Sequence, residues 1–195
     1  LLDKHDYYQE AVQKALLRRL DLDSEESKEF QLLKGAFFER AKKESSGVMF
    51  SEMLIWLYSQ VDNFEGVFNQ VVAVDIRSKA NGYRLFDFGM VCRENKDYQT
   101  AIRAFQEAMT ISSADELKMK SQVGILNVGY IKVAKLKTYT VEELQKIISH
   151  YEEVLEKIQT PNSRTLSIVL EYAELLAYHY GDREKALKVL SETEK

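Results

Sequence analysis

The chain has 195 residues, of which 45% are hydrophobic and 30% charged, enough for one ordinary domain or a short array of repeats. This balance is typical of a soluble, well-ordered protein and excludes an intrinsically disordered chain. The net charge is −4, with both signs mixed along every segment. No basic stripe is available for a phosphate backbone, which argues against nucleic-acid binding.

The single cysteine, Cys92, excludes an internal disulfide framework and offers no metal cluster. The longest apolar run, around Phe50–Tyr58, is interrupted by Glu52 and falls short of the roughly 20 residues that span a bilayer, so no membrane insertion is expected. The sequence shows no signal peptide, but it begins at Leu1 rather than Met, which fits a segment of a longer protein whose upstream signal or domain has been removed. Cytoplasm and periplasm both stay open as compartments.

One proline and eight glycines leave little room for the turns of an all-β fold, and helical periodicity runs through the whole chain. In chain order we predict ten helices, over residues 4–20, 25–44, 48–61, 64–78, 82–95, 97–111, 115–137, 140–159, 163–180 and 182–194. Because the connections are short, consecutive helices are expected to be antiparallel neighbours.

The breaks between the predicted helices have chemical causes. They are an acidic turn at 21–24, cap residues and a glycine at 45–47, the turn dipeptide Asn81-Gly82, and Pro161-Asn162. Two helix starts also fit a capping box, in which a hydroxyl and a Glu three residues later satisfy each other's backbone amides. These pair Ser113 with Glu116, and Thr140 with Glu143.

A stretch in the middle of the chain repeats an earlier one at a fixed offset, which takes position 54 to position 88. Residues of matching character occupy six aligned positions: Phe88 and Leu54, Cys92 and Tyr58, Asp97-Tyr98 and Asn63-Phe64, Ala101 and Val67, Phe105 and Val71, Ala108 and Val74. So many matches at one fixed offset predict a repeat array.

The repeat resembles a known family, the tetratricopeptide (TPR) repeat, a helix-turn-helix unit of about 34 residues. The resemblance is carried by Leu85-x2-Phe88-Gly89-x2-Cys92 followed by Ala101-x3-Phe105-x2-Ala108. This sequence departs from the family at the first aromatic position, where it has Leu85, and at the terminal proline, where it has Ser113. The strongest repeats are expected at 48–81 and 82–115, and looser ones at 116–160 and 163–195.

The third repeat fits when a short insertion is allowed around Lys135–Thr140. The resemblance implies one all-α domain over residues 1–195, a right-handed superhelix of four to five antiparallel helix pairs in which each pair buries its apolar face against the next. Its looser copies resemble the TPR arrays of bacterial proteins.

Gly89 lies inside a predicted helix, where glycine costs roughly 1 kcal/mol relative to alanine. We expect it to let the two antiparallel helices of its unit approach closely, with Gly129 in the same role in the next unit. The alternative is that both glycines accommodate a bulky neighbour from another helix. The hydrophobic residues assigned to the core are Val67, Val71, Tyr98, Ala101, Ile102, Phe105 and Ile147.

No catalytic, cofactor or metal site is predicted, and the chain is not expected to be an enzyme. His5, His150 and His179 lie on separate helices at no metal-ligand spacing, and no glycine-rich phosphate loop is present. Cys92 stands where the TPR repeat places a tyrosine. Because nothing nearby in sequence would stabilise a thiolate, we expect it to be a small buried apolar residue.

The resemblance implies a scaffold that binds a protein or peptide of unknown identity on its concave face, lined by the first helix of each unit. The predicted groove residues are Met53, Trp56, Tyr83, Phe86, Met90, Asn127, Tyr130, Tyr172 and Leu175. Exposed apolar surface usually marks an interaction site, and Trp and Tyr are favoured as anchors. A carboxylate clamp like that of chaperone-binding TPR domains is not expected, because among the corresponding residues only Asn127 fits.

Two alternatives stay open. The same side chains could be covered, either between neighbouring first helices or by a further helix. The chain could also be a structural or oligomerisation segment of a longer repeat array, with self-association and no separate ligand site.

Overall fold

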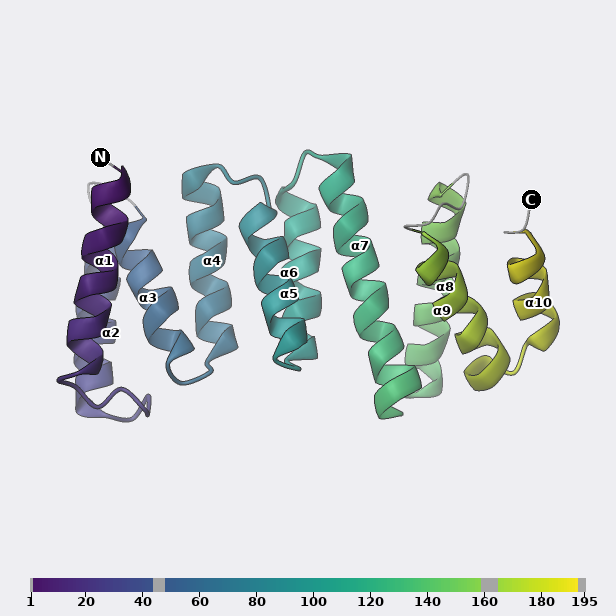
Figure 1. Ribbon diagram of the computed structural model, residues 1–195, viewed down its shortest axis with the longest axis horizontal. Helices are drawn as coiled ribbons and strands as arrows, with labels where there is room; N and C mark the ends of the chain where they lie inside the picture. Colours follow the sequence, from purple (N-terminus) through teal and green to yellow (C-terminus); the bar gives the residue numbers. More distant parts are fainter. Residues whose placement is uncertain (1, 44–47, 159–164, 193–195) are drawn as a thin grey trace. The chain divides into compact units, whose positions relative to one another are not determined.

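The computed structural model describes residues 2–43, 48–158 and 165–192, with side chains from residue 8 onward. Its regular elements are all helical (Figure 1), and these ranges contain no strand. The helices are α1 (Leu2–Leu17), α2 (Lys28–Ala41), α3 (Met49–Ser59), α4 (Phe64–Ser78), α5 (Tyr83–Glu94), α6 (Tyr98–Ile111), α7 (Asp115–Tyr130), η2 (Ile131–Leu136), α8 (Val141–Lys157), α9 (Leu166–Leu175), η3 (Leu176–Tyr180) and α10 (Arg183–Glu192). Within the described residues, the prediction of an all-α chain with ten helices is confirmed, since η2 and η3 directly continue α7 and α9. The predicted breaks at 45–47 and 161–162 lie outside the described residues.

The chain forms two compact units, unit 1 (Leu1–Ser113) and unit 2 (Ala114–Lys195). Unit 1 holds α1 to α6, and unit 2 holds α7 to α10 with the π-helical turns η2 and η3. The division falls close to the predicted boundary between the second and third repeats.

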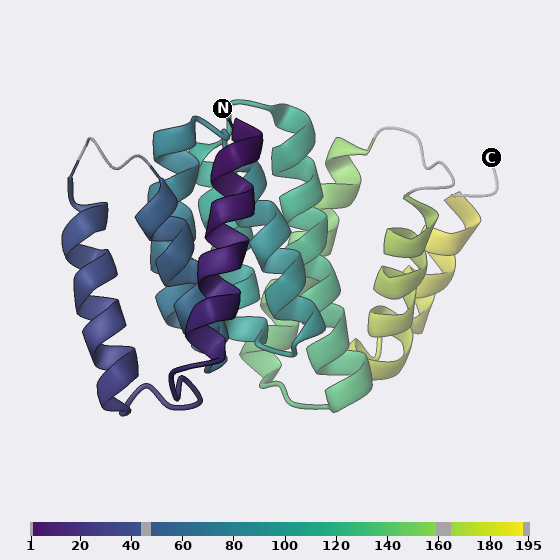
Figure 2. The same ribbon diagram turned by 60° about the vertical axis from the view of Figure 1, so that its left-hand side comes forward.

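Unit 1 contains two helical hairpins that start at equivalent places in the repeat. The helices α3 and α5 begin at Met49 and Tyr83, and α4 and α6 begin at Phe64 and Tyr98, so both pairs of starts are separated by the offset of the sequence repeat. Figures 1 and 2 both show these four helices side by side with alternating direction. Within unit 1, α4 contacts α3, α5 and α6, so it joins the two hairpins.

The turn inside each hairpin has the same local chemistry. Asp62 and Lys96 adopt left-handed backbone conformations, with φ of 51° and 65°. The next residue then caps the second helix: Asn63 Oδ1 accepts from the backbone N–H of Gly66 at 2.7 Å, and Asp97 Oδ1 accepts from that of Thr100 at 3.2 Å. The two hairpins therefore turn at equivalent places and in the same way.

The aligned apolar positions of the two hairpins are buried, as the repeat predicted. Leu54, Tyr58, Val67, Val71 and Val74 are buried in the first, and Phe88, Cys92, Ala101, Phe105 and Ala108 in the second. Of the remaining residues assigned to the core, Tyr98, Ile102 and Ile147 are half-buried.

Gly89 and Gly129 each face a side chain of the paired helix. A Cβ atom at Gly89 would lie 2.7 Å from Cε1 of Phe105, and one at Gly129 would lie 3.1 Å from Cγ1 of Ile147. The structure therefore favours the alternative explanation: each glycine makes room for a bulky side chain, and the nearest atoms are not backbone atoms.

The connection between the two hairpins is held by Asp75 and by the predicted Asn81-Gly82 turn. Both turn residues have positive φ, 55° and 88°, and a Cβ at Gly82 would lie 2.6 Å from the Ala108 carbonyl oxygen, so only glycine fits. The buried Asp75 carboxylate accepts from the backbone N–H groups of Gly82 (2.8 Å) and Arg84 (3.1 Å). A side chain at the end of α4 thus caps the start of α5, where the helix dipole favours a negative charge.

One of the two predicted capping boxes is confirmed. Thr140 Oγ1 accepts from the Glu143 backbone N–H at 3.1 Å, and Glu143 Oε2 accepts from the Thr140 N–H at 2.8 Å, at the start of α8. The box at Ser113 was wrong. The N-cap of α7 is Ala114, one residue later, and Ser113 instead donates its backbone N–H to Asn81 Oδ1 at 2.9 Å.

The first helix of each hairpin in unit 2 ends in a π-helical turn. The helix α7 continues into η2, and α9 continues into η3. The second hairpin then repeats the turn chemistry of unit 1: Gly181 has φ of 88°, and Asp182 Oδ1 accepts from the Lys185 backbone N–H at 2.9 Å. The hairpin of α9 and α10 can therefore be aligned with those of unit 1 at this turn.

Candidate functional site

A row of side chains in unit 1 lies on the first helices of the two hairpins. Three positions of α3 and their equivalents on α5, one repeat later, form it: Met49, Glu52 and Trp56, then Tyr83, Phe86 and Met90. Met49 and Tyr83 are exposed, and the other four are half-buried. Four of the nine predicted groove residues, Trp56, Tyr83, Phe86 and Met90, therefore offer surface here; we call these four the α3–α5 row.

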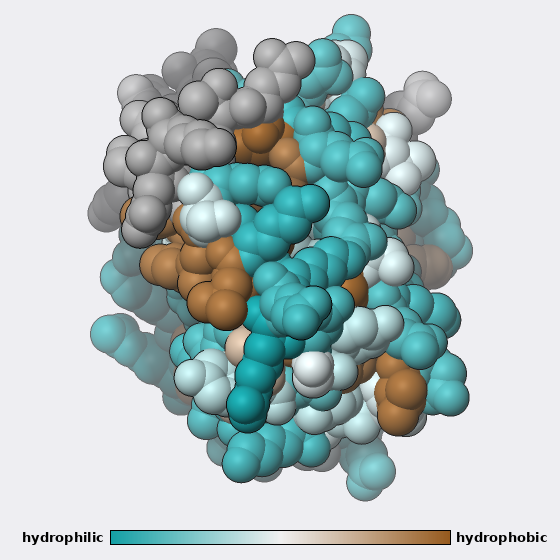
Figure 3. Space-filling model, turned by 90° about the vertical axis from the view of Figure 1, so that its right-hand side faces the viewer, coloured by the Kyte–Doolittle hydropathy of each residue, from teal (hydrophilic) through white to brown (hydrophobic). Residues whose placement is uncertain are grey.

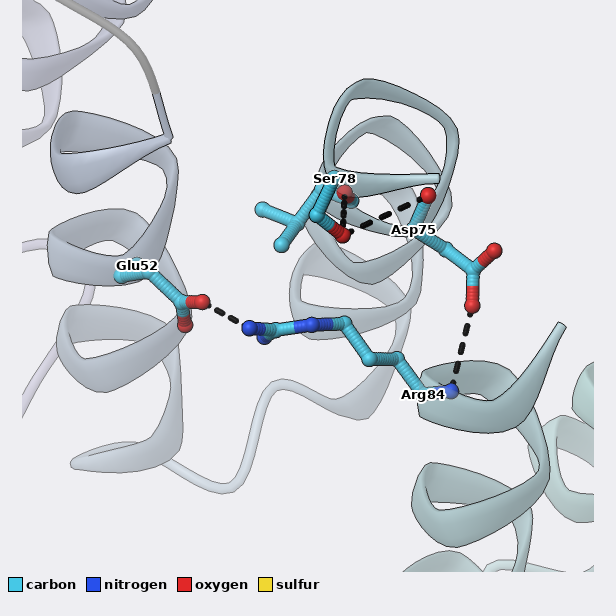
Figure 4. Close-up of polar contacts among 5 residues, drawn as sticks. Glu52, Asp75, Ser78 and Arg84 are labelled. Carbon is cyan, nitrogen blue, oxygen red and sulfur yellow. Dashed lines mark hydrogen bonds and ion pairs between the residues drawn. The ribbon is translucent and has the colours of Figure 1, made fainter. Parts of the chain in front are cut away.

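An ion pair links the two helices of this row. Figure 4 shows Arg84 of α5 reaching Glu52 of α3, with its Nη1 2.6 Å from Glu52 Oε1. The backbone N–H of the same arginine donates to Asp75 of α4. Arg84 thereby contacts both helices of the preceding hairpin.

Another predicted groove residue of unit 1, Met53, is covered. Its side chain is buried, and Gln13 of α1 donates to its Sδ at 3.8 Å. Because α1 packs on α3, Met53 is covered, which is the alternative that the sequence analysis left open for the groove residues.

Two of the four predicted groove residues of unit 2 are buried in its core, and the other two are half-buried. Leu175 is 0% exposed and Tyr172 is buried beside it in one apolar cluster. Tyr130 packs against that cluster and donates its hydroxyl to Glu174 at 2.8 Å. Asn127 is half-buried, with its Nδ2 3.5 Å from Glu171 Oε1. We expected Tyr172 and Leu175 to line an apolar stripe open to solvent, but both side chains are buried.

The core of unit 2 contains a polar network that the sequence did not reveal. The rings of Tyr151 and Tyr172 stack with centroids 5.6 Å apart, and their hydroxyls donate, both at 2.9 Å, to Glu171 and Glu152 respectively. Burial raises the pKa of Glu171, while the hydrogen bonds from Tyr151 and Asn127 act against it. Each of these carboxylates has a hydrogen-bond donor, so the network stabilises the core and needs no ligand to complete it.

Burial or a hydrogen bond within the fold explains the environments of Cys92, His150 and His179. Cys92 is buried, and burial, followed by the charge of Asp97, raises the pKa of its thiol to about 12, which opposes thiolate formation. Burial lowers the pKa of His150, and His179 Nδ1 lies 3.2 Å from the Tyr139 hydroxyl. The side chain of His5 lies outside the described residues. Within the ranges that the structure describes, no three His, Cys, Asp and Glu side chains gather where they could hold a metal ion.

Each unit also has an apolar hollow. In unit 1 a hollow of about 360 Å³ lies between α5 and the α3–α4 hairpin, lined by Ile55, Val67, Val71, Phe88 and Val91 among others. In unit 2 a more open hollow of about 590 Å³ lies on the α9–α10 hairpin, lined by Leu170, Ala173, Ala177, Ala186, Leu187 and Leu190 among others. The second hollow was not predicted from the sequence.

No family model, curated protein or solved structure matches this chain. In the described part of the chain, no helix has the length and apolar character that crossing a membrane requires.

Proposed function

We propose that the chain is a non-catalytic scaffold of TPR-like hairpins that binds a protein or peptide segment through the α3–α5 row. The observation that carries this proposal is the row itself: Trp56, Tyr83, Phe86 and Met90 keep part of their surface exposed at equivalent positions of two hairpins. Aromatic and Met side chains are enriched among the residues that dominate binding.

The TPR-like architecture is part of the same proposal. Three observations support it: helix starts one repeat apart, the shared capped turn, and buried residues at the aligned positions. A superhelical course of the hairpins is the arrangement that such repeats adopt when they stack.

The electrostatics of the row favour a peptide with a mixed or neutral character. Glu52 and Arg84 already neutralise each other beside the row, and Asp87 adds one exposed negative charge on α5. Apolar anchors would therefore supply the affinity, and we expect only a weak salt dependence of binding.

The proposal can be tested by selecting peptides from a displayed library on the whole chain. The selected peptides should bind a Trp56→Ala/Met90→Ala variant at least tenfold more weakly. They should bind an Ile76→Ala variant as tightly as the original chain, because Ile76 is an exposed apolar residue of α4 outside the row. Circular dichroism would verify that all three proteins are folded. Peptides that bind all three equally, or a library that yields no binder, would contradict the proposal.

A second candidate, a structural or oligomerisation segment, is favoured by a different observation, the apolar hollow on α9 and α10.

A further inference from the structure

Met53 is buried at a position that the next hairpin leaves open to solvent. Its side chain is 4% exposed, whereas Asp87, the residue one repeat later on α5, is exposed. Met53 lies three residues before Trp56, so both side chains share the face of α3 that carries the α3–α5 row. Because α2 packs on α3 as α4 packs on α5, the difference comes from α1, whose Gln13 donates to the Met53 sulfur.

The helix α1 is not a member of the repeat. One repeat before α3 the chain runs through residues 15–25, which hold the end of α1 and most of its connection to α2. Figure 2 shows α1, in purple, on the near side of unit 1 and apart from α2. Among the described residues, α1 packs chiefly on α3. It is therefore an added helix, placed on the face of the first hairpin that carries Met53.

The contact between α1 and α3 is weak for a packed helix. From residue 8 to the end of α1 no side chain is buried, whereas every other helix of unit 1 has buried residues. The half-buried side chains of α1 are Gln9, Gln13 and Leu16, which form one narrow stripe, and two of them are amides. The Gln13 amide meets the thioether sulfur of Met53 at 3.8 Å, and a thioether is a weak acceptor. Little free energy is therefore lost when this contact breaks.

Two large apolar side chains of α1 stay in solvent. Tyr8 is 65% exposed and Val12 is 47% exposed, although each directly precedes one of the glutamines of the inward stripe. A helix that is packed for stability alone buries its apolar side chains, and a conflict between side-chain character and burial is typical of functional sites. Elements held by few buried contacts are also the ones that open locally while the rest of a domain stays folded.

The occupant seen on Met53 indicates which kind of partner fits there. Apolar side chains are exposed elsewhere too: Leu187 of α10 is 69% exposed, and Figure 3 shows apolar side chains among hydrophilic ones on the side of unit 2 that it faces. Exposure by itself does not identify a partner. At Met53 the structure shows the occupant, and it is a helix that presents one narrow stripe of side chains. The surface beside the row therefore accepts a helix.

We propose that α1 is a detachable cover of the α3–α5 row, and that the partner segment is an amphipathic helix that takes its place on Met53. In the open form Met53 joins Trp56 as one apolar surface of α3. A partner helix with leucine or methionine where α1 has Gln9 and Gln13 packs better on Met53, because burial of an amide without a good acceptor costs free energy. The inference rests on the proposed function for the partner, but the opening of α1 is measured without one.

The opening is tested by labelling a thiol that Met53→Cys places under α1. Cys92 is the only other thiol of the chain and is buried in the core, so it reports on unfolding of unit 1 as a whole. In native buffer a maleimide should label position 53 roughly tenfold faster than Cys92, or more. Labelling of both thiols at one rate would mean that α1 leaves only when unit 1 unfolds, and would overturn the proposal.

Two changes in α1 should move the labelling rate at position 53 in opposite directions. Leu16→Asp places a charge in the inward stripe and should raise the rate roughly tenfold. Gln13→Leu replaces the amide by an apolar side chain and should lower the rate roughly threefold. Leu17→Asp is the matched control, because Leu17 is the next residue of the same helix and is exposed, so the rate should stay within about twofold.

The place of the partner is tested with a synthetic helix as the probe. The probe carries residues 2–20 of this chain with leucine in place of Gln9 and Gln13, and a fluorescent label for anisotropy. It should bind the Leu16→Asp chain roughly tenfold more tightly than the original chain, because the apparent affinity scales with the open fraction. For the same reason the Gln13→Leu chain should bind it more weakly. The fold-changes in affinity and in labelling rate should agree for each variant while the open form is the minor one.

Met53→Asp, added to Leu16→Asp, should abolish binding of the probe, which would locate the probe on α3. Circular dichroism of each variant would separate opening of α1 from unfolding. Equal binding to all chains, no binding to the folded Leu16→Asp chain, or binding that survives Met53→Asp overturns the proposal, because α1 then covers no surface that a helix can use. A Leu17→Asp chain that opens as readily as the Leu16→Asp chain also overturns it. The peptide selection described above can fail separately, because it depends on Trp56 and Met90 and not on α1.

Discussion

The ring of Phe105 on α6 lies against Gly89 on α5, so closely that a Cβ atom at Gly89 would stand 2.7 Å from Cε1 of the ring. The preceding hairpin has Ile55 and Val71 at the equivalent positions. The second hairpin therefore has no side chain on its first helix and a large ring on its second helix, whereas the first hairpin has a medium-sized side chain on each. Both hairpins keep the same fold. A second pair of positions differs in the same way: a Cβ at Gly66 would lie 2.6 Å from Cδ1 of the Tyr58 ring in the first hairpin, whereas the second hairpin has Thr100 and Cys92 at these positions.

The first prediction is that Gly89→Ala destabilises unit 1 although alanine is the better helix former. Phe105 is fully buried and cannot move away, so the added methyl group should cost about 1–3 kcal/mol of unfolding free energy in urea titrations. Gly35→Ala is the matched control. Gly35 also lies inside a helix, but a Cβ there meets nothing within 4 Å, so this change should stabilise by up to about 1 kcal/mol.

A double change tests the exchange of volume itself. Gly89→Ile with Phe105→Val transfers the pair of the first hairpin into the second, and its loss of stability should be smaller than the sum of the single losses, by about 0.5–3 kcal/mol. Strictly additive losses of unfolding free energy would show that the side chains at positions 89 and 105 do not compete for the same volume.

The second prediction concerns Asp75, which is 0% exposed and caps α5 with both carboxylate oxygens. Asp75→Ala leaves two buried N–H groups without this acceptor and should cost about 2–4 kcal/mol of unfolding free energy. Asp75→Asn keeps one acceptor oxygen and should cost less. Asp87→Ala, at an exposed aspartate within α5, should change stability by no more than about 0.5 kcal/mol. Equal effects at Asp75 and Asp87 would contradict the capping role.

The third prediction is a pH dependence with opposite signs at two glutamates. Burial raises the pKa of Glu171, so the folded state holds this proton more tightly than the unfolded state does. Its contribution to stability is therefore most favourable near and below the ordinary glutamate pKa of about 4.3, and is lost as the pH rises through the folded value. Relative to a Glu171→Gln variant, the original chain should become less stable between that pH and neutrality.

Glu143 provides the opposite case. The backbone N–H of Thr140 and then Lys132 lower its pKa, so its contribution to stability is present above the unfolded pKa and is lost as the pH falls through the folded value. Relative to Glu143→Gln, the original chain should therefore gain stability toward neutral pH. Urea titrations of the three proteins across this pH range would check both slopes, and slopes of the same sign would show that one of the two environments is misassigned.

The fourth prediction uses Trp56, the single tryptophan of the chain. It is half-buried on α3, and its backbone carbonyl accepts from the Gln60 side chain at 2.9 Å. Acrylamide should therefore quench its fluorescence measurably in the folded chain and more strongly in urea, and a peptide bound to the α3–α5 row should reduce the quenching. Resistance to acrylamide without any peptide would show that the row is closed.

Much of the fold follows from interactions between residues that are close in the sequence. Helical periodicity, the Asn81-Gly82 turn and the capping box at Thr140 depend on contacts within a few residues, and these predictions hold in the structure. Val67, Val71, Ala101 and Phe105, which the repeat assigned to the core, are buried, because both hairpins place these positions toward the same neighbours; Tyr98 and Ile102 are only half-buried.

What the sequence left open was decided by contacts between helices distant along the chain. Whether Gly89 faces a backbone or a ring depended on where Phe105 points, and whether Met53 is open depended on α1. The burial of Tyr172 and Leu175, and the exposure of Leu170 and Leu187 on the same hairpin, could not be read from their apolar character. Periodicity identifies which residues share a helix face, but the free energy of burial is decided by the neighbour that covers that face, and only the tertiary structure supplies the neighbour.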